Sequence, residues 1–317
     1  MANKNDCIDE AQHLLITQTY RPSKYIEKTI KEGSKQKERK ISIPKFYPDQ
    51  IIQWAVLLQT IPYFTKGMYV FTCGSVPNRG TSYAKRYLER WLHNDFKGTR
   101  YCLKLDVHHF YQSVNHNCLK EMLKHKFKDG KLLKLFCQII DSTEEGLPIG
   151  NVTSQWFANF YLQGLDHYIK EKLHAKYYVR YMDDMVILGS NKRKLGKMKA
   201  AIEEYLNNIG LELNSKWQKF KTDSRGIDFL GYRFFHYKTI LRHSIMLRIS
   251  RKVRKVYKKK SYNKHNCMSI ISYLGWIKHS DSYKFYQKWI KPYANIKRMK
   301  GVIRRENFKY SYAKQGV

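Results

Sequence analysis

Two adjacent aspartates interrupt an otherwise apolar stretch of the chain. The segment from Tyr177 to Leu188 predicts a β-hairpin, because β-branched and aromatic residues stand on both sides of Asp183 and Asp184. Neighbouring carboxylates at the tip of an apolar hairpin repel each other and are poorly solvated, so a positive partner should offset them. A divalent metal ion, which takes oxygen ligands, would do so. The alternative is a surface turn that happens to be Asp-Asp, since aspartate is a common turn residue.

An acid at the end of another strand supplies a partner for this hairpin. The alternation from Tyr101 to Val107 predicts a strand that carries Asp106 at its end. The chain then continues with a helix, the hairpin, a second helix closed by Gly210 and a short strand over 211–216. Together with the first strand, these elements have a βαββαβ-like order. Because this order places both acidic tips on one sheet, the carboxylates can converge as a catalytic metal site requires.

The charge of the chain indicates a polyanionic partner. Its 317 residues include 60 Lys plus Arg against 26 Asp plus Glu, a net charge of +34, yet 43% are hydrophobic. This combination favours a folded protein that faces nucleic acid, with an anionic membrane surface as the second candidate. The apolar runs are far shorter than the roughly 18 residues that span a bilayer. The first residues show no apolar signal region, so we expect an intracellular protein with no membrane partner.

Basic and loop segments flank the acidic strands. The cluster at 35–44 runs into an alternating Ile-Ser-Ile strand and could hold phosphates, although a solvated face is the more frequent meaning of such a run. Asp49 is expected to cap the helix that follows it. After the Gly/Pro loop at 144–151, a helix is expected in which Ser154 and Gln155 face a substrate. Basic helices after 247 suit a surface that follows a nucleic-acid duplex.

Three aspartates between a basic arm and a basic helical tail suit one kind of chemistry. In phosphoryl transfer, two metal ions roughly 3.5–4 Å apart activate the attacking oxygen and stabilise the leaving oxygen. Here these oxygens would be a 3′-hydroxyl and a pyrophosphate. Metals provide charge compensation on both oxygens at once, which side chains alone do not.

The combined motifs resemble those of a reverse transcriptase. Tyr181-Met182-Asp183-Asp184 lies between apolar strands, and Leu105-Asp106-Val107 is followed by Phe110-Tyr111-x-Ser113-Val114. Motifs of this kind extend over most of the chain. The resemblance implies an α+β right-hand polymerase with fingers at 1–98, a ferredoxin-like palm at 99–235 and a helical thumb at 236–317.

The resemblance also implies roles for individual residues. Asp106 and Asp183 would bind the two Mg²⁺ ions, assisted by the backbone carbonyl of Val107. Asp184 would be a further metal ligand beside them. Residues that contact the incoming nucleotide would be Arg39, Lys37, Tyr111, Ser154 and Gln155. Tyr111 would be the steric gate against the ribose 2′-hydroxyl, the one group that distinguishes the two sugars. Lys216 would act as general acid on the pyrophosphate. The primer grip would be Phe229, Leu230, Gly231 and Tyr232. Mn²⁺ is the alternative metal.

Within this family, two segments are similar to the reverse transcriptases of diversity-generating retroelements. Residues 149–155 fit the Ile-Gly-x-x-x-Ser-Gln signature, and Ser272 to His279 resembles the same group. The resemblance implies error-prone cDNA synthesis at adenines of a template-repeat RNA for targeted gene diversification. It implies dNTPs, an RNA/DNA heteroduplex and an accessory variability protein as partners, in the cytoplasm of a bacterial or phage-infected cell. The alternatives are a group II-like or defence-associated reverse transcriptase and a catalytically inactive RNA-binding scaffold.

Overall fold

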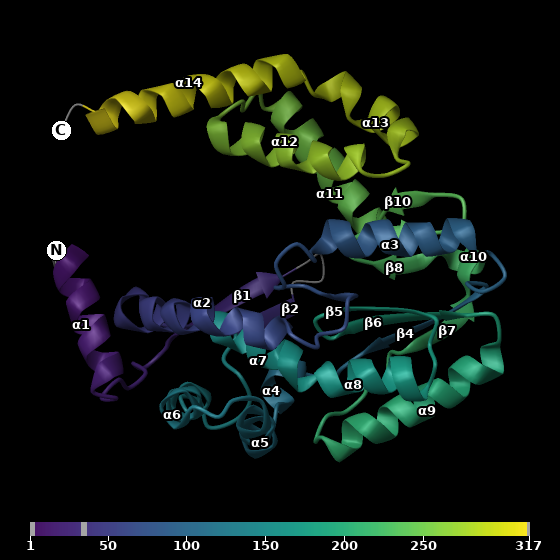
Figure 1. The fold of residues 1–317 in the computed structure, drawn as a ribbon. Helices are drawn as coiled ribbons and strands as arrows, with labels where there is room; N and C mark the ends of the chain where they lie inside the picture. The colour runs from purple at the N-terminus through teal and green to yellow at the C-terminus, as the bar shows by residue number, and fades with distance from the viewer. Residues whose placement is uncertain (1–3, 33–36, 316–317) are drawn as a thin grey trace. The chain divides into compact units, whose positions relative to one another are not determined.

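The computed structural model describes residues 4–32 and 37–315, and the contacts within the chain separate two units. The first unit contains residues up to 91 together with 97–221. The second contains 92–96 together with 222–317. Figure 1 shows the helices and strands, and each unit is described by itself.

A five-stranded sheet forms the centre of the first unit. Its strand order is β3-β5-β6-β4-β7. The strands are β3 (Thr72–Cys73), β4 (Tyr101–Asp106), β5 (Tyr177–Tyr181), β6 (Asp184–Gly189) and β7 (Gln218–Lys221). The four strands after β3 are antiparallel in the ferredoxin-like order, and β3 adds a parallel edge strand to β5. This arrangement confirms the α+β fold with a ferredoxin-like palm.

Helices cover this sheet, which explains why β6 reads as a nearly continuous apolar run. α8 (Gln163–His167) and α9 (Lys192–Asn208) lie along one face of the sheet (Figure 1). α9 buries its apolar stripe at three- and four-residue spacing, and Asn191 caps its start through the backbone N–H groups of residues 193 and 194. Gly210 follows α9 with a φ of 74°, as its position after the predicted helix indicated.

The prediction of a strand at 211–216 is wrong. Within the described residues, this segment makes a single bridge, from Leu213 to Val107, and the strand that pairs with β4 on the side away from β6 is β7. The physical reason is Asn214, whose side-chain oxygen accepts a hydrogen bond from Lys216 N and whose backbone oxygen accepts one from Trp217 N. An asparagine that bonds its own backbone two residues on makes a turn, so the chain bends before the strand begins.

A two-stranded antiparallel ribbon precedes the sheet in the chain. β1 (Ile26–Glu32) pairs with β2 (Lys37–Ile43), which confirms the strand predicted at the Ile-Ser-Ile alternation. α1 (Lys4–Ile16) comes before the ribbon and α2 (Ile51–Thr65) after it. Asp49 does not cap α2, contrary to the prediction. It is buried and accepts hydrogen bonds from Tyr20 Oη at 2.8 Å and Ser23 N at 3.2 Å, so it anchors the segment before β1 instead.

An aromatic core joins α2 to the helices that lie between β4 and β5. Besides α8 and the short π-helical turn Tyr168–Lys172, these are α4 (Phe110–Ser113), α5 (His116–Lys126), α6 (Gly130–Ile140) and α7 (Val152–Tyr161). Phe64 of α2 packs against Phe136 of α6 and Phe157 of α7, with ring centroids 5.9 and 6.1 Å away. Such edge-on and tilted contacts of buried rings hold the three helices together.

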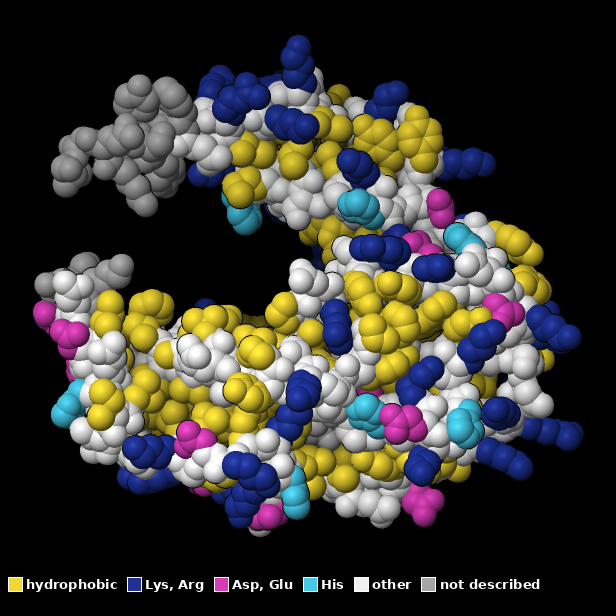
Figure 2. All heavy atoms as spheres, in the orientation of Figure 1, with side chains coloured by type: hydrophobic (Ala, Val, Ile, Leu, Met, Phe, Trp, Pro, Cys, Tyr) yellow, Lys and Arg dark blue, Asp and Glu magenta, His cyan; other side chains and the backbone are white. Residues whose placement is uncertain are grey.

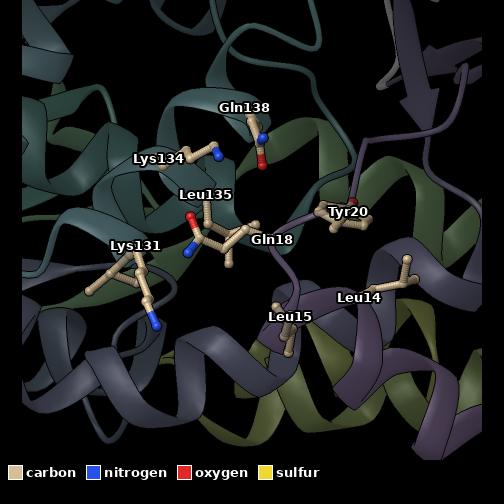
Figure 3. Close-up of a pocket in the computed structure, with 9 residues that line it drawn as sticks. Leu14, Leu15, Gln18, Tyr20, Lys131, Lys134, Leu135 and Gln138 are labelled. Carbon is tan, nitrogen blue, oxygen red and sulfur yellow. The ribbon is translucent and has the colours of Figure 1, made fainter.

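A small hollow lies beside this core. Its volume is about 120 Å³, and Figure 3 shows Leu14, Leu15 and Tyr20 facing Lys131, Lys134 and Leu135 of α6 across it. The described residues that line it include none that is predicted to bind metal or nucleotide, so we assign it no part in the chemistry.

The second unit combines a small sheet with helices. β8 (Ile227–Phe229), β9 (Tyr232–Phe234) and β10 (Thr239–Leu241) form an antiparallel sheet in the order β10-β9-β8. The helices are α10 (Thr222–Arg225), α11 (His243–Lys258), α12 (Lys264–Lys278), α13 (Tyr283–Trp289) and α14 (Ile296–Gln315), while α3 (Thr81–Asn94) crosses from the first unit into the second. α12 and α14 lie side by side (Figure 1). Across the described ranges, no helix combines the length and apolar character needed to cross a membrane.

Candidate active site

The sheet brings the three predicted acids to one edge. β5 and β6 form the predicted hairpin, with Met182 and Asp183 in its turn and Asp184 as the first residue of β6. Asp184 pairs directly with Asp106, the last residue of β4. Directly paired residues on antiparallel strands have Cβ atoms about 5 Å apart. Two acids are therefore cross-strand neighbours, and Asp183 lies next to them in the turn.

The environment of Asp183 and Asp184 disfavours their charged forms. Burial raises the pKa of Asp184 to about 7, with the Lys104 ammonium opposing this and the Asp106 charge adding to it. Lys104 Nζ lies 3.3 Å from Asp184 Oδ2, whereas Asp184 Oδ1 is buried and has no hydrogen-bond partner among the described residues. Burial also raises the pKa of Asp183, followed by the charge of Asp106. The neighbouring positive charges, Lys104 beside Asp184 and Arg39 and Arg180 near Asp183, thus offset burial and repulsion only in part.

The available ligands suit a hard divalent cation. Carboxylate oxygens and a backbone carbonyl are what Mg²⁺ accepts, and Asp184 Oδ1 is an oxygen of this kind. The backbone of Val107 is fixed because both of its chain neighbours are hydrogen-bonded. Asp106 O accepts from the backbone N of residue 214, and His108 N donates to the backbone O of residue 212. Within the ranges the structure describes, no group of three or more His, Cys, Asp or Glu side chains is arranged so that it could hold a metal ion. The three acids fit a metal ion by chemistry and by strand position.

Sequence reasoning missed one residue beside these acids. Asn214 Nδ2 donates a hydrogen bond to Asp106 Oδ2 at 2.9 Å, and Asn214 N donates to Asp106 O at 2.8 Å. Asn214 therefore fixes both the carboxylate and the backbone of Asp106. The same asparagine accepts a hydrogen bond from the backbone N of Lys216, whose side chain is exposed. Asparagine is a common turn residue because it bonds to the backbone two residues on. This is the sequence signal that could have identified the turn at Asn214.

Two of the residues predicted to contact a nucleotide interact electrostatically with Asp183. Burial raises the pKa of Tyr111, and the charge of Asp183 raises it further. The Arg39 guanidinium, on exposed β2, acts in the opposite direction on Asp183 by lowering its pKa. Both side chains thus share the electrostatic environment of the acidic turn. Lys37 begins β2, but its side chain lies outside the described part of the structure.

The loop before α7 contacts the strand that carries Arg39. Ser42 N donates a hydrogen bond to Ile149 O at 2.9 Å, and a Cβ on Gly150 would lie 2.2 Å from Ser42 O. Gly150 is therefore required by close backbone approach. Gln155 is exposed, as predicted, but Ser154 is only 1% exposed. The expectation that Ser154 faces a substrate is wrong for this structure, because α7 is buried on nearly every side.

The predicted primer-grip residues lie in the second unit. Leu230 and Gly231 form the turn between β8 and β9, with φ of 52° and 81°. Tyr232 stacks on Trp276 of α12 with ring centroids 5.3 Å apart, and a Cβ on Gly231 would meet the same ring at 2.5 Å. Arg242 N donates to Gly231 O. The turn is thus fixed to α12 within its own unit.

The surface agrees with a polyanionic partner. Figure 2 shows Lys and Arg side chains spread across the viewed face, with fewer Asp and Glu side chains among them. A surface of this charge attracts phosphate backbones over distances of about a Debye length.

Comparison with known proteins identifies the family. Residues 28–234 match the family model described as "Reverse transcriptase (RNA-dependent DNA polymerase)". The retron Ec73 reverse transcriptase of Escherichia coli is 27% identical over 227 residues, which cover 64% of this chain and 68% of that protein. The group II intron-encoded protein LtrA of Lactococcus lactis subsp. cremoris is 27% identical over 165 residues, 48% of this chain but only 26% of LtrA.

Solved structures share the fold at low sequence identity. Apo telomerase from Candida tropicalis has a TM-score of 0.52 and 16% identity, and the match covers 73% of this chain and 52% of that one. Telomerase from Candida albicans, in complex with a fragment of telomeric RNA, has a TM-score of 0.57 and 11% identity over 86% of this chain and 56% of that one. The chain thus spans about half the length of these telomerases. The family match over more than half of the chain, together with three acids on adjoining strand ends, shows that the protein belongs to the reverse transcriptase family of RNA-dependent DNA polymerases.

Proposed function

We propose that this chain synthesises DNA on an RNA template with Asp106, Asp183 and Asp184 as its catalytic acids. The observation that carries the proposal is the direct pairing of Asp184 with Asp106 beside the turn that holds Asp183. The inactive RNA-binding scaffold is disfavoured, because a scaffold has no need of three aspartates on adjoining strand ends, two of which have a pKa that burial raises.

The acids would serve by binding two Mg²⁺ ions, with Mn²⁺ as the alternative. Asp106, Asp183 and the Val107 carbonyl would be ligands, and Asp184 would lie alongside them. Bound divalent ions supply charge compensation on the attacking 3′-oxygen and on the leaving pyrophosphate. Asn214 would hold the Asp106 carboxylate in a fixed direction through its 2.9 Å hydrogen bond.

The remaining predicted residues would bind the substrates. Arg39 and Lys37 would hold the triphosphate of a dNTP, Tyr111 would exclude a 2′-hydroxyl, and Gln155 would contact the nucleotide. Lys216 would protonate the pyrophosphate as it leaves, because its exposed ammonium can donate a proton. The turn at 229–232 would hold the primer strand. In this proposal the fingers are residues 1–98, the palm 99–235 and the thumb 236–317.

For the biological reaction, we propose error-prone copying of a template-repeat RNA in a diversity-generating retroelement. The segment Ile149 to Gln155 supports this, together with the Ser272–His279 segment. An accessory variability protein would be the partner, and the reaction would take place in a bacterial cytoplasm. The similarity to a retron reverse transcriptase and to LtrA favours the second candidate, a group II-like or defence-associated reverse transcriptase.

One experiment tests both levels of the proposal. The protein extends a DNA primer on a mixed-sequence RNA with dNTPs or NTPs, wild type is compared with Asp183→Ala, and the products are sequenced. The proposal requires Mg²⁺-dependent DNA from wild type and none from the variant. Absence of DNA from wild type, even with its native RNA and accessory protein, would overturn the polymerase assignment. Accurate copying of template adenines would overturn the diversity-generating assignment and leave the second candidate.

A further inference from the structure

A fully buried ion pair lies directly behind the acidic turn. Arg180 of β5 and Asp166 of α8 are both 0% exposed. Arg180 Nε donates to Asp166 Oδ1 at 2.8 Å and Nη2 donates to Oδ2 at 2.6 Å, a two-pronged contact that a guanidinium makes and an ammonium does not. Tyr178 Oη and Thr72 Oγ1 donate to the same carboxylate at 2.6 and 2.7 Å. Asp166 is therefore held in one orientation, and it holds Arg180 in turn.

The third nitrogen of Arg180 reaches the turn itself. Nη1 donates to Met182 O at 2.8 Å and to Asn159 Oδ1 at 3.2 Å. Met182 immediately precedes Asp183 and has a φ of 56°, a left-handed conformation that a non-glycine residue adopts only at a cost. Because the peptide unit is planar, a fixed Met182 carbonyl also fixes the amide of Asp183.

The opposite side of the turn is held by the segment after β3. Met182 N donates to Cys73 O at 3.2 Å, and Asn159 Nδ2 donates to Gly74 O at 3.0 Å. Gly74 has a φ of 90°, and a Cβ there would lie 3.1 Å from the Met182 side chain. Both polar groups of the Met182 backbone are thus bonded to fixed partners.

We propose that Arg180, oriented by Asp166, is a positioning residue that fixes the Met182–Asp183 peptide and so sets the direction in which Asp183 presents its carboxylate. Stability alone does not require such a pair, because well-packed apolar residues of similar volume are often as stable as a buried ion pair. The planar, forked geometry of Arg180 instead serves to reach the carboxylate and the turn at once. The inference rests on the proposed polymerase function, since positioning has an effect on rate only if Asp183 takes part in the reaction.

The test compares variants of the full chain by three measurements. These are the kcat and the dNTP KM in primer extension, Mn²⁺ binding to the protein alone by electron paramagnetic resonance, and urea unfolding. Arg180→Lys keeps the positive charge but loses the planar guanidinium that contacts Asp166 and Met182 O at once. We expect about a 10²-fold lower kcat, as for misplacement of a catalytic group by about 1 Å, with an unchanged dNTP KM and weaker Mn²⁺ binding. Gly74→Ala strains the backbone at a φ of 90° and crowds the Met182 side chain from the other side without a change of charge, and we expect the same pattern.

Tyr178→Phe is the matched control. It removes one hydrogen bond to Asp166 but leaves every bond from Arg180 to Asp166 and to Met182 O, and the Thr72 bond with the two Arg180 bonds still orients Asp166. We expect a loss of stability with kcat and Mn²⁺ binding unchanged. If Tyr178→Phe loses as much kcat as Arg180→Lys at equal loss of stability, the role of the pair is merely structural and the proposal is overturned. A folded Arg180→Lys protein with wild-type kcat and Mn²⁺ binding also overturns it. If wild type makes no DNA but Arg180→Lys still weakens Mn²⁺ binding, the proposed function fails while the positioning role stands.

Discussion

Replacement of Gly150 by alanine tests whether the loop before α7 positions the strand that carries Arg39. The added Cβ would lie 2.2 Å from Ser42 O, whereas real Cβ contacts stay above about 3.0 Å. The obstacle is backbone rather than a flexible side chain, so β2 must retreat. The φ of 143° at this position is also one that only glycine adopts readily.

The size of the effect follows from these contacts. Holding a non-glycine residue in a disfavoured backbone region costs about 1–3 kcal/mol. Loss of the 2.9 Å hydrogen bond from Ser42 N to Ile149 O costs about 1 kcal/mol more. We therefore expect Gly150→Ala to lower the free energy of unfolding by about 2–4 kcal/mol. Because Arg39 lies three residues before Ser42 on β2, its contact with the triphosphate should weaken as well.

The assay measures urea unfolding and the dNTP KM in primer extension. A lost charge-assisted hydrogen bond is worth about 1.5–3 kcal/mol, which corresponds to about a 10- to 100-fold higher KM. Gly130→Ala is the control, since a Cβ there meets no described atom within 4 Å. If Gly150→Ala matches the control in both stability and KM, the argument that this glycine positions β2 is refuted.

Four further predictions concern the acids and their neighbours. Asn214→Ala frees the Asp106 carboxylate and should lower kcat by about 10- to 100-fold with little change in dNTP KM, as measured by steady-state extension. Tyr111→Val should let NTPs enter while dNTP incorporation persists, and equal discrimination in wild type and variant would contradict the gate. Removal of divalent ions by EDTA should stop extension, and added Mg²⁺ should restore it. Asp183→Asn should abolish extension without a loss of stability in urea unfolding, because burial and then the charge of Asp106 already disfavour the Asp183 carboxylate in the folded protein.

The sequence was most informative where local periodicity determines structure. The alternation around Asp106 and the apolar runs around Asp183 predict strands with acids at their ends, and the structure contains both. The element order predicts the ferredoxin-like sheet, because few topologies are compatible with short right-handed connections. Gly210 is recognisable because a helix that ends in a left-handed residue favours glycine.

The errors arose where a side chain forms contacts with distant segments. Asp49 reads as a helix cap but bonds to Tyr20; the turn at Asn214 is local, whereas its bond to Asp106 joins distant segments. The buried pair of Arg180 and Asp166 leaves no periodic signal, since each residue is a single buried charge in a five-residue element. Contacts of this kind depend on tertiary packing and cannot be derived from spacing along the chain.

The most direct test of the central claim is incorporation of one dNTP into a DNA primer paired with RNA, measured against Mg²⁺ concentration for wild type and Asp106→Asn. Asp129→Asn makes the same chemical change at the N-terminus of α6, where asparagine caps a helix as well as aspartate does. The account predicts Mg²⁺-dependent incorporation by wild type and Asp129→Asn, and none by a folded Asp106→Asn protein. Incorporation by Asp106→Asn at the wild-type rate would contradict the claim that Asp106 and the acidic hairpin form one catalytic site.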